Sequence, residues 1–318
     1  MNSTKAFDLV TLGEAMIEFN QTTSGERQFL QGFGGDTSNA AIAAARAGAK
    51  SAYLTRLGAD TFGDELMALW QAEGVDTQAV VRDTKHPTAV YFVTHGKTGH
   101  QFSYLRKDSA ASHMSPDWLE QPAPQALLQS TKWLLVSGIS MAISANACDT
   151  VFAAMRQAQA AGAQVALDSN LRLKLWPLER ARACITHAVS MCDLFLPSLE
   201  DMTALTGLKT PEEIIEWSHQ QGAKTVVLKL GEKGALISQS GQSGQKSHAP
   251  AFQAKAIDAT GAGDCFCGNL LARLAAGDDV ATATSYANAA ASIAVEGFGA
   301  VNPLPKKDQV KARQSTQP

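Results

Sequence analysis

The stretch Asp258-Ala259-Thr260-Gly261-Ala262-Gly263-Asp264 separates two segments of different character. The preceding residues, Phe252 to Ile257, are extended in pattern, and the following residues repeat apolar side chains at helical spacing until Gly277. This order predicts a strand, a glycine turn and a helix, with Asp264 in the first helical turn. Glycines let backbone N–H groups approach an anion closely, and the positive end of the helix dipole favours a phosphate or a developing negative charge.

Asp264 adds a carboxylate to this predicted anion site, directly after Gly263. The natural task of a carboxylate there is to accept the proton of a hydroxyl that attacks a phosphate. The alternative is a first-turn aspartate that only complements the helix dipole, worth about 0.3–1 kcal/mol. The glycine turn and its position after a late strand favour the general base.

The composition is that of a globular protein and gives no electrostatic case for nucleic acid or a membrane surface as a partner. The 318 residues carry a formal net charge of −3, with 45% hydrophobic and 18% charged residues, and this length buries a substantial core in one large domain or two. The first residues lack the apolar region of a signal peptide. The longest uncharged run, Trp133 to Cys148, is shorter than the roughly 20 residues of a bilayer span. Five irregularly spaced cysteines favour a reducing cytoplasm over a disulfide framework.

Predicted strands and helices alternate along most of the chain, most regularly between Trp133 and Leu230. This alternation predicts a mainly parallel sheet that is covered by helices on both faces. In such sheets, ligands bind at the carboxyl ends of the strands. Polar or glycine-rich motifs fall at that edge: Gly34-Gly35-Asp36, Asp168 to Arg172, Ser198 to Asp201, Lys229 to Gly234, and the stretch at 258–264.

A second, smaller sheet is predicted from segments with period-2 alternation. Ala89 to Thr94 and Gln101 to Arg106 flank the turn His95-Gly96-Lys97-Thr98-Gly99, which predicts a hairpin. With the extended pieces between residues 15 and 33, this hairpin is expected to project from the main body.

Two other segments are expected to be irregular. The proline-rich segment Gln121 to Gln125 predicts a loop, and residues 305–318 predict a loose polar tail.

Side chains near the first glycine pair suit a polyol. Gly34 and Gly35 allow close approach of a ligand, and Asp36 and Asn39 can hydrogen-bond vicinal hydroxyls. The alternative is a tight turn followed by a helix cap.

The predicted hairpin carries candidate residues for an acidic ligand. Tyr104 and Arg106 fall on the same face of one strand, and Tyr91 on the partner strand could face the same cleft. Arg106 suits bidentate binding of a carboxylate. The alternative is a solvated edge of the small sheet.

Two more motifs follow predicted strands. Asp168, Asn170 and Arg172 alternate after a buried strand, and Arg172 could bind either the transferring phosphoryl group or a substrate carboxylate; the alternative is an Asx turn with a surface arginine. The turn from Lys229 through Gly231 to Gly234 suits a nucleotide phosphate, and a plain hairpin turn is as good an interpretation.

Together, these motifs resemble the ribokinase-like (PfkB) carbohydrate kinase family over nearly the whole chain, from Phe7 to about Pro303. The resemblance rests on Gly34-Gly35-Asp36 with Asn39 and on Asp258-x-Thr260-Gly261-Ala262-Gly263-Asp264, which is highly specific to the family. It implies a three-layer α/β/α sandwich with a mainly parallel central sheet. Residues 1–304 would form one kinase domain, with a β-sheet lid from about 15–33 and 88–107 that often forms an oligomer interface.

Within the family, the chain is most similar to the 2-keto-3-deoxygluconate kinases. This similarity implies ATP-dependent phosphorylation of the primary hydroxyl of a sugar acid to its 6-phosphate, with Mg²⁺ and a possible monovalent cation, in a cytoplasmic homo-oligomer. The residues behind it are Gly13-Glu14, Gly32 to Thr37, Tyr104-x-Arg106-Lys107, Ser137 to Ser140, and Asp168-x-Asn170-x-Arg172 with Leu175-Trp176.

The resemblance also assigns roles to matching residues. Asp264 is the base, and Gly261, Ala262 and Gly263 form the anion hole, with Arg172 at the transferring group. The sugar acid is held by Gly34, Gly35, Asp36, Asn39, Tyr91, Tyr104, Arg106 and Arg172, and the nucleotide by Lys229, Gly231, Gly234, Thr260 and Asn288, the last near the adenine. Asp201 is the water-mediated Mg²⁺ ligand, although the family commonly has Glu there and Asn where this chain has Ser198.

Two other functions stay open. A fructokinase or ribokinase acts on a neutral sugar, which gives a buried Arg106 no partner. A non-catalytic sugar-sensing homologue has no need of a base, and the intact stretch from Gly261 to Asp264 argues against it. The gluconate-derived and galactonate-derived epimers are both compatible with the sequence.

Overall fold

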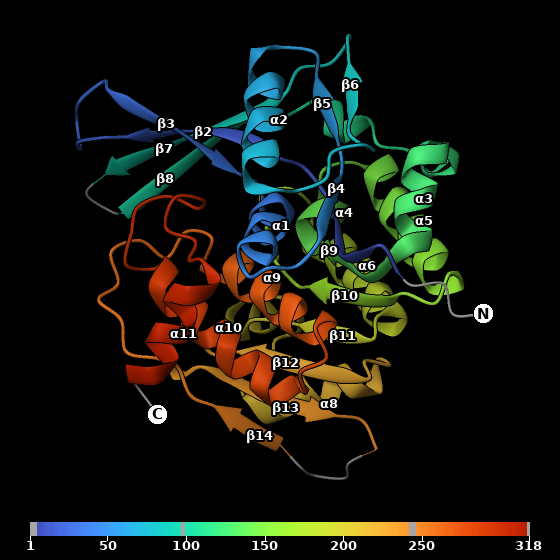
Figure 1. The fold of residues 1–318 in the computed structure, drawn as a ribbon, viewed down its shortest axis with the longest axis vertical. Coiled ribbons are helices and arrows are strands. Elements are labelled where there is room, and N and C mark those ends of the chain that lie inside the picture. The colour runs from blue at the N-terminus through green and yellow to red at the C-terminus, as the bar shows by residue number, and fades with distance from the viewer. Residues whose placement is uncertain (1–4, 97–98, 242–245, 317–318) are drawn as a thin grey trace.

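Eight strands form the central sheet of the computed structural model, in the order β14-β13-β12-β11-β10-β9-β1-β4 (Figure 1). The structure describes residues 5–96, 99–241 and 246–316. Neighbouring strands from β12 to β4 pair in parallel, and β13 is antiparallel to β12 and β14. The prediction of a mainly parallel sheet is confirmed. The strands are β1 (Phe7–Leu12), β4 (Ser51–Leu54), β9 (Thr131–Ser137), β10 (Gln164–Asp168), β11 (Leu194–Leu196), β12 (Thr225–Lys229), β13 (Ala235–Gln239) and β14 (Lys246–Ala249).

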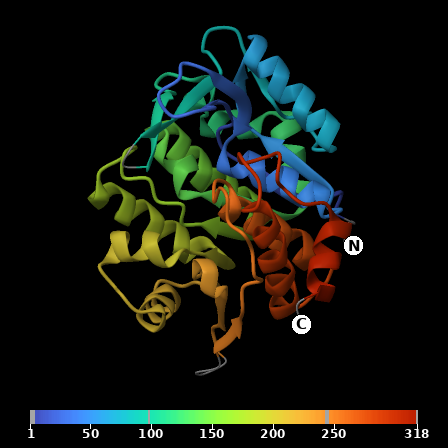
Figure 2. The same ribbon diagram turned by 90° about the vertical axis from the view of Figure 1, so that its left-hand side faces the viewer.

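Helices cover both faces of this sheet, so the three-layer α/β/α prediction is also confirmed (Figures 1 and 2). One layer holds α1 (Asp36–Arg46), α2 (Thr61–Glu73), α9 (Ala262–Ala275), α10 (Val280–Ala294) and α11 (Lys307–Thr316). The other holds α3 (Pro122–Ser130), α4 (Gly138–Ala142), α5 (Ala145–Ala160), α6 (Leu178–Met191), α7 (Leu199–Thr206) and α8 (Pro211–Gln220). Short 3-10 turns are η1 (Ala110–His113), η2 (Pro116–Glu120) and η3 (Gly231–Lys233).

Alternation along the strands gives each helical layer its own core. Leu135 of β9 packs in the core under α1 and α9, whereas Leu134 packs in the core under α3 and α5. Successive strand residues point to opposite faces of a sheet, so a continuous apolar strand serves both layers.

The strand order reverses between β1 and β9. From β1 the central sheet grows to β4 on one side, and β9 to β12 then follow one another on the other side. Open α/β sheets bind ligands in the crevice at the carboxyl ends of the strands where the order reverses. The topology therefore positions a binding site next to the ends of β1, β9 and β10.

A separate four-stranded sheet projects from this body, with the order β3-β2-β7-β8 (Figure 1). The predicted hairpin is confirmed as β7 and β8, and its turn residues Lys97 and Thr98 lie outside the described residues. Strand β2 bridges the hairpin and β3, parallel to β7 and antiparallel to β3. The strands are β2 (Met16–Gln21), β3 (Phe29–Gly34), β7 (Ala89–Gly96) and β8 (Gly99–Leu105); β5 (Arg56–Gly58) and β6 (Val81–Asp83) pair separately.

The prediction of a strand before the glycine turn is wrong. Residues 252–257 have no strand assignment. The N–H groups of Ile257 and Asp258 donate to the carbonyl of Val295 at the end of α10, at 2.7 and 3.2 Å. This segment is therefore held by a helix end rather than by a neighbouring strand.

Two segments expected to be irregular are helical. The prediction of a proline-rich loop at residues 121–125 is wrong, because α3 begins at Pro122. Proline is tolerated at the first helical position, since the N–H group that it lacks has no acceptor within the helix there. The prediction of a loose polar tail is also wrong. The helix α11 buries Val310, and its Arg313 pairs with Glu296 at 2.6 Å. None of the described helices is long and apolar enough to cross a membrane.

Candidate active site

A cleft of about 650 Å³ lies at the carboxyl ends of the central strands, between the main body and the small sheet. Most of the residues that the sequence singled out line it. These are Gly35, Asp36, Asn39, Tyr91, Tyr104, Arg106, Arg172, Asp201, Lys229, Thr260, Gly261, Gly263 and Asp264.

The stretch at 258–264 forms a tight turn that enters α9. Asp258 holds this turn, since one carboxylate oxygen accepts hydrogen bonds from the N–H and hydroxyl of Thr260, and the other from the N–H of Gly299. Gly261 caps the helix with a φ of 75°, a conformation that favours glycine. The first N–H groups of a helix have no acceptor within the helix, so this end of α9 presents donors to the cleft.

Asp264 is fixed by a residue 225 positions earlier in the chain. The Asn39 amide donates to the Asp264 carboxylate at 2.8 Å, from α1 to α9. The two helices approach closely at Gly268, where an added Cβ would lie 2.2 Å from the carbonyl oxygen of Ala40. The missing side chain thus lets the helices meet and brings the two polar groups together.

Burial and the nearby Asp36 charge raise the pKa of Asp264 to about 7, against the lowering effect of the Asn39 hydrogen bond. Burial also raises the pKa of Asp36, which accepts a hydrogen bond of 2.9 Å from the Asn170 amide. Both carboxyl groups therefore sit in surroundings that disfavour their charged forms.

The sequence suggested that Asn39 and Asp36 hydrogen-bond the hydroxyls of a polyol. In the structure, both side chains already have hydrogen-bond partners within the protein. Several buried side-chain atoms in the described part of the chain have no hydrogen-bond partner, and Asn39 Oδ1 is one of them. This oxygen leaves an acceptor beside Asp264.

Arg106 is paired within the protein. Its guanidinium contacts the Glu14 carboxylate, which is 1% exposed and also accepts a hydrogen bond from the Ser109 hydroxyl. The Tyr104 ring lies 5.7 Å from the guanidinium carbon, and the Tyr91 hydroxyl donates to Glu18. Sequence reasoning did not include Glu14 among the site residues. Its signals were its position directly after the first strand and its place in the Gly13-Glu14 motif behind the resemblance.

Two further ion pairs line the cleft. Lys229 contacts Asp168 at 2.7 Å; although burial opposes it, the Asp168 charge raises the pKa of Lys229. The side chain of Arg172 is 52% exposed and lies 3.9 Å from Asp201, which accepts a hydrogen bond from Ser169. The predicted polar clusters thus meet across neighbouring strand ends.

Five predicted residues do not line the cleft. Gly34 lies against the Tyr91 ring, and Ala262 is within the first turn of α9. Gly231 begins the η3 turn and Gly234 follows it, and the Asn288 amide donates to the carbonyls of Ala249 and Pro250 at 2.9 and 3.1 Å.

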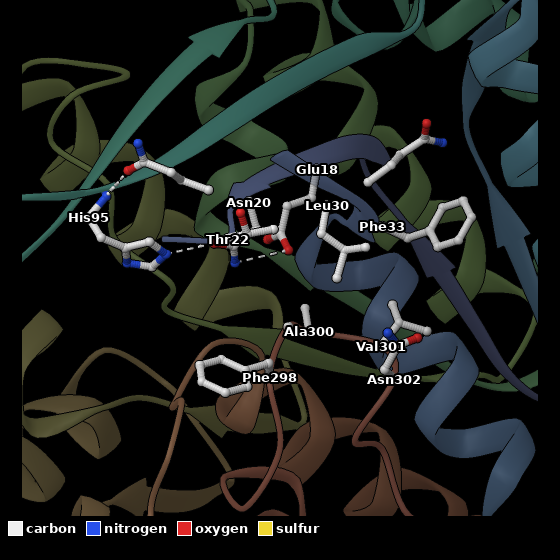
Figure 3. Close-up of a pocket in the computed structure, with 14 residues that line it drawn as sticks. Glu18, Asn20, Thr22, Leu30, Phe33, His95, Phe298, Ala300, Val301 and Asn302 are labelled. Carbon is white, nitrogen blue, oxygen red and sulfur yellow. Dashed lines mark hydrogen bonds between the residues drawn. The ribbon is translucent and has the colours of Figure 1, made fainter. Parts of the chain in front are cut away.

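A second pocket of about 240 Å³ lies between the small sheet and residues 298–302 (Figure 3). Its polar wall carries Glu18 and Asn20, and its rim carries Leu30 and Phe298, which are 63% and 68% exposed. Its lining lacks the Asp264 carboxylate and the N-terminus of α9, so the larger cleft is the better candidate for chemistry.

Residues 6–307 match the profile of the pfkB family of carbohydrate kinases. The chain belongs to this family. The chain is 32% identical to a 2-dehydro-3-deoxygluconokinase of Dickeya dadantii, over 93% of this chain and 97% of that protein. This pfkB-family chain also resembles the crystal structure of a PfkB protein from Polaromonas sp. JS666, with a TM-score of 0.86 and 33% identity over 96% of this chain and 100% of that one. A fructokinase from Vibrio cholerae O395, bound to fructose, ADP and calcium, has a TM-score of 0.85 and 30% identity, over 96% and 98% of the two chains.

Proposed function

We propose that this pfkB-family chain transfers the γ-phosphoryl group of ATP to the primary hydroxyl of 2-keto-3-deoxy-D-gluconate, giving the 6-phosphate. The observation that carries the proposal is the half-buried Asp264 carboxyl, with a pKa of about 7, at the N-terminus of α9 inside the cleft. A general base works best when its pKa lies near the working pH. The similarity to 2-dehydro-3-deoxygluconokinases supports the choice of substrate.

In this proposal, Asp264 takes the proton of the attacking hydroxyl while that oxygen bonds to the γ-phosphorus. The bond from the γ-phosphorus to the bridging oxygen breaks, and ADP leaves with the electron pair. The backbone around Gly261, Ala262 and Gly263 donates to the negative charge, and donors of this kind are worth roughly 2.7–4 kcal/mol in other enzymes. The hydrogen bond from Asn39 holds the base in position.

For the sugar acid, we infer that the substrate carboxylate binds Arg106 with Tyr104 and Tyr91 beside it, near Gly34. A guanidinium has five N–H donors, and Glu14 occupies only part of them, so a second carboxylate has room to bind. The exposed Arg172 supplies further positive charge for the substrate or the transferring phosphoryl group. Asp36 and Gly35 line the same region.

For the nucleotide, we infer ATP with a divalent cation, as the solved kinases of this family bind ATP or ADP with magnesium or calcium. Asp201 would hold Mg²⁺, because one of its oxygens has only a 3.9 Å contact with Arg172, and oxygen ligands suit this ion. When bound, Mg²⁺ neutralises charge on the phosphates. Lys229 and Thr260 also line the cleft. The nucleotide-binding roles of Gly231, Gly234 and Asn288 and the role of a monovalent cation stay predictions.

A fructokinase-type activity on a neutral sugar is the second candidate. The observation that favours it is the Glu14–Arg106 pair, which balances the arginine charge without a substrate carboxylate. A coupled ATP-turnover assay over keto sugar acids, neutral sugars and nucleosides separates the candidates. We expect turnover with 2-keto-3-deoxygluconate to exceed that with fructose. The reverse order would assign the neutral-sugar activity, and binding without turnover of any substrate would favour a sensor.

We also propose that the small sheet acts as a lid over the cleft and pairs with a second copy of the chain. The apolar side chains Leu30, Leu105 and Phe29 are exposed on this sheet, where a partner would cover them. We expect the protein in the cytoplasm, where its five free cysteines would stay reduced. Sedimentation of the chain with and without Leu105→Glu tests the pairing.

A further inference from the structure

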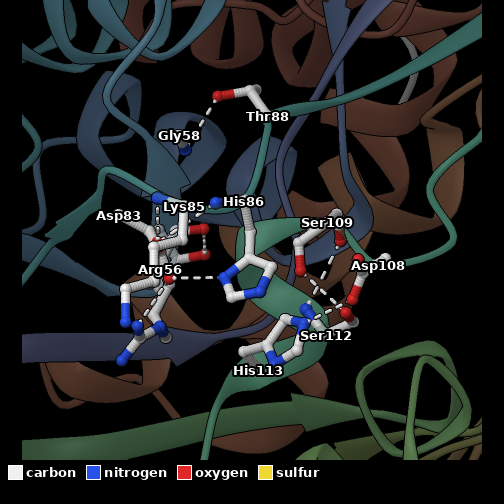
Figure 4. A network of polar contacts seen from close by, with 11 residues as sticks. Arg56, Gly58, Asp83, Lys85, His86, Thr88, Asp108, Ser109, Ser112 and His113 are labelled. Atoms are coloured by element: carbon white, nitrogen blue, oxygen red, sulfur yellow. Dashed lines mark hydrogen bonds and ion pairs between the residues drawn. The ribbon is translucent and has the colours of Figure 1, made fainter.

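His86 and His113 form a stacked pair away from the cleft lining. Their ring centroids are 3.6 Å apart with an interplanar angle of 21° (Figure 4). His86 follows β6, and His113 ends η1. The N–H of Ala110 donates to the carbonyl of Pro87 at 2.9 Å, so the backbone holds the two histidine-bearing segments together.

Carboxylates flank both rings. His113 Nε2 lies 2.6 Å from Asp108 Oδ1, and His86 Nδ1 lies 3.1 Å from Asp83 Oδ2. Asp83 is itself anchored by Arg56 at 2.7 Å and by the N–H of Lys85 at 2.8 Å. Figure 4 shows Asp83 and Asp108 on opposite sides of the histidine pair.

The two carboxylates have different roles because they differ in burial. Asp83 is 7% exposed, and its bond to His86 Nδ1 leaves the Nε2 lone pair available. This carboxylate–histidine arrangement commonly orients a metal ligand. Asp108 is largely exposed, with its side chain at 71%, and can open away from His113.

We propose that His86, Asp108 and His113 bind one divalent transition-metal ion of the Zn²⁺ class, with Asp83 orienting His86. One ligand atom from each of the three residues lies within 4.8 Å of the others. Tetrahedral ligands at 2.0–2.2 Å are about 3.3 Å apart, so the ion requires His113 and Asp108 to separate slightly. The lone pair of an imidazole nitrogen lies in the ring plane, so the two stacked rings must also tilt until both planes meet at the ion. Two imidazoles and one carboxylate suit Zn²⁺ or Co²⁺ far better than Mg²⁺, which prefers oxygen ligands.

The site would clamp residues 108–113 against residues 83–87. Asp108 lies two residues after Arg106 and directly before Ser109, which donates to Glu14. The clamp therefore involves the segment that carries the Arg106–Glu14 pair. The proposed metal site stands independently of the kinase activity, because its ligands do not line the cleft.

The test is titration of the full chain with Co²⁺, read by its ligand-field absorption, with Zn²⁺ in competition. We expect one equivalent of tetrahedral Co²⁺, displaced by Zn²⁺ and retained in excess Mg²⁺. His86→Ala and His113→Ala should each weaken binding at least tenfold, and Asp83→Asn roughly 10–100-fold, the range for lost ligand-orienting carboxylates. His248→Ala removes an exposed histidine on β14 and should change nothing.

The proposal is overturned by either of two results. One is Co²⁺ binding of equal affinity in His86→Ala, His113→Ala and His248→Ala, which would indicate scattered surface histidines. The other is the absence of tetrahedral Co²⁺ absorption in the unmodified chain. Far-UV circular dichroism and the milder variants His86→Gln and His113→Gln separate lost binding from lost folding.

Discussion

The two walls of the cleft are built in different ways. On the main body, Asp264 and Asn39 are brought together by two helices whose backbones touch at Gly268. On the small sheet, Arg106 and Tyr104 are held by side-chain contacts, mainly the pair with Glu14. Packed backbones move little, whereas paired side chains can exchange partners. This difference fits the proposed roles, with the chemical step on the rigid wall and substrate recognition on the adjustable one.

The largest expected effect is loss of the base on the rigid wall. Asp264→Asn should lower kcat roughly 10²–10⁴-fold, the range for general-base catalysis, with little change in KM. Asn can keep the hydrogen bond from Asn39 through its own oxygen, so the geometry stays. Steady-state kinetics with 2-keto-3-deoxygluconate measure this. Asp279→Asn, at the exposed N-cap of α10, is the matched control, and near-normal turnover in Asp264→Asn would remove the residue as base.

The pH dependence of kcat should show the same group. Because the pKa of Asp264 is raised to about 7, the carboxyl is protonated below that pH and cannot accept a proton. Activity should therefore fall roughly tenfold per pH unit below about 7 and level off above it. A profile from pH 5 to 8 in constant ionic strength checks this, and an acid limb centred near 4 would contradict the raised pKa.

Arg106→Ala probes the adjustable wall. Hydrogen bonds to charged groups are worth about 1.5–3 kcal/mol, so KM for the sugar acid should rise roughly 10–100-fold while kcat changes less. Turnover of a neutral sugar should not be impaired to the same degree. Lys107→Ala, an exposed neighbour on the same segment, is the control. Equal losses for acid and neutral sugars would show that Arg106 supports the fold of the lid rather than recognising a carboxylate.

Gly268→Ala should give the smallest effect. It tests whether close packing of α1 and α9 keeps the rigid wall in place. The added Cβ would lie 2.2 Å from the Ala40 carbonyl oxygen, so α1 and α9 must separate. Overpacking of this kind costs typically about 1–3 kcal/mol of stability, and we expect kcat to fall more than KM changes. Denaturant unfolding and kinetics measure the two effects. An unchanged kcat at reduced stability would separate helix spacing from the position of the base.

The sequence predicted the fold well because its strands, helices and turns carry local signals. The alternating strands, the hairpin and the glycine turn at 258–264 were all recognisable from short-range patterns. The strand before that turn was not a strand, since its hydrogen bonds go to the end of α10, a partner no local pattern reveals. The tail helix was missed because its burial rests largely on Val310 in an otherwise polar segment.

The site was predictable as a set of residues but not as a set of pairs. Most of the residues that strand ends and glycine turns identified line the cleft. The partners Asn39–Asp264 and Glu14–Arg106 join segments far apart in the chain, and only tertiary packing creates them. Glu14 was consequently not counted among the site residues, although it pairs with the arginine that we propose to bind the substrate.

The distance of 225 residues between Asn39 and Asp264 has a consequence for synthesis on the ribosome. The first strands, α1 and the small sheet emerge early, but the proposed base and the N-terminus of α9 emerge only in the last fifth of the chain. A nascent chain therefore contains most of the residues that we propose for sugar binding before it contains the proposed base. Under the proposed mechanism, a chain that ends before α9 cannot transfer a phosphoryl group.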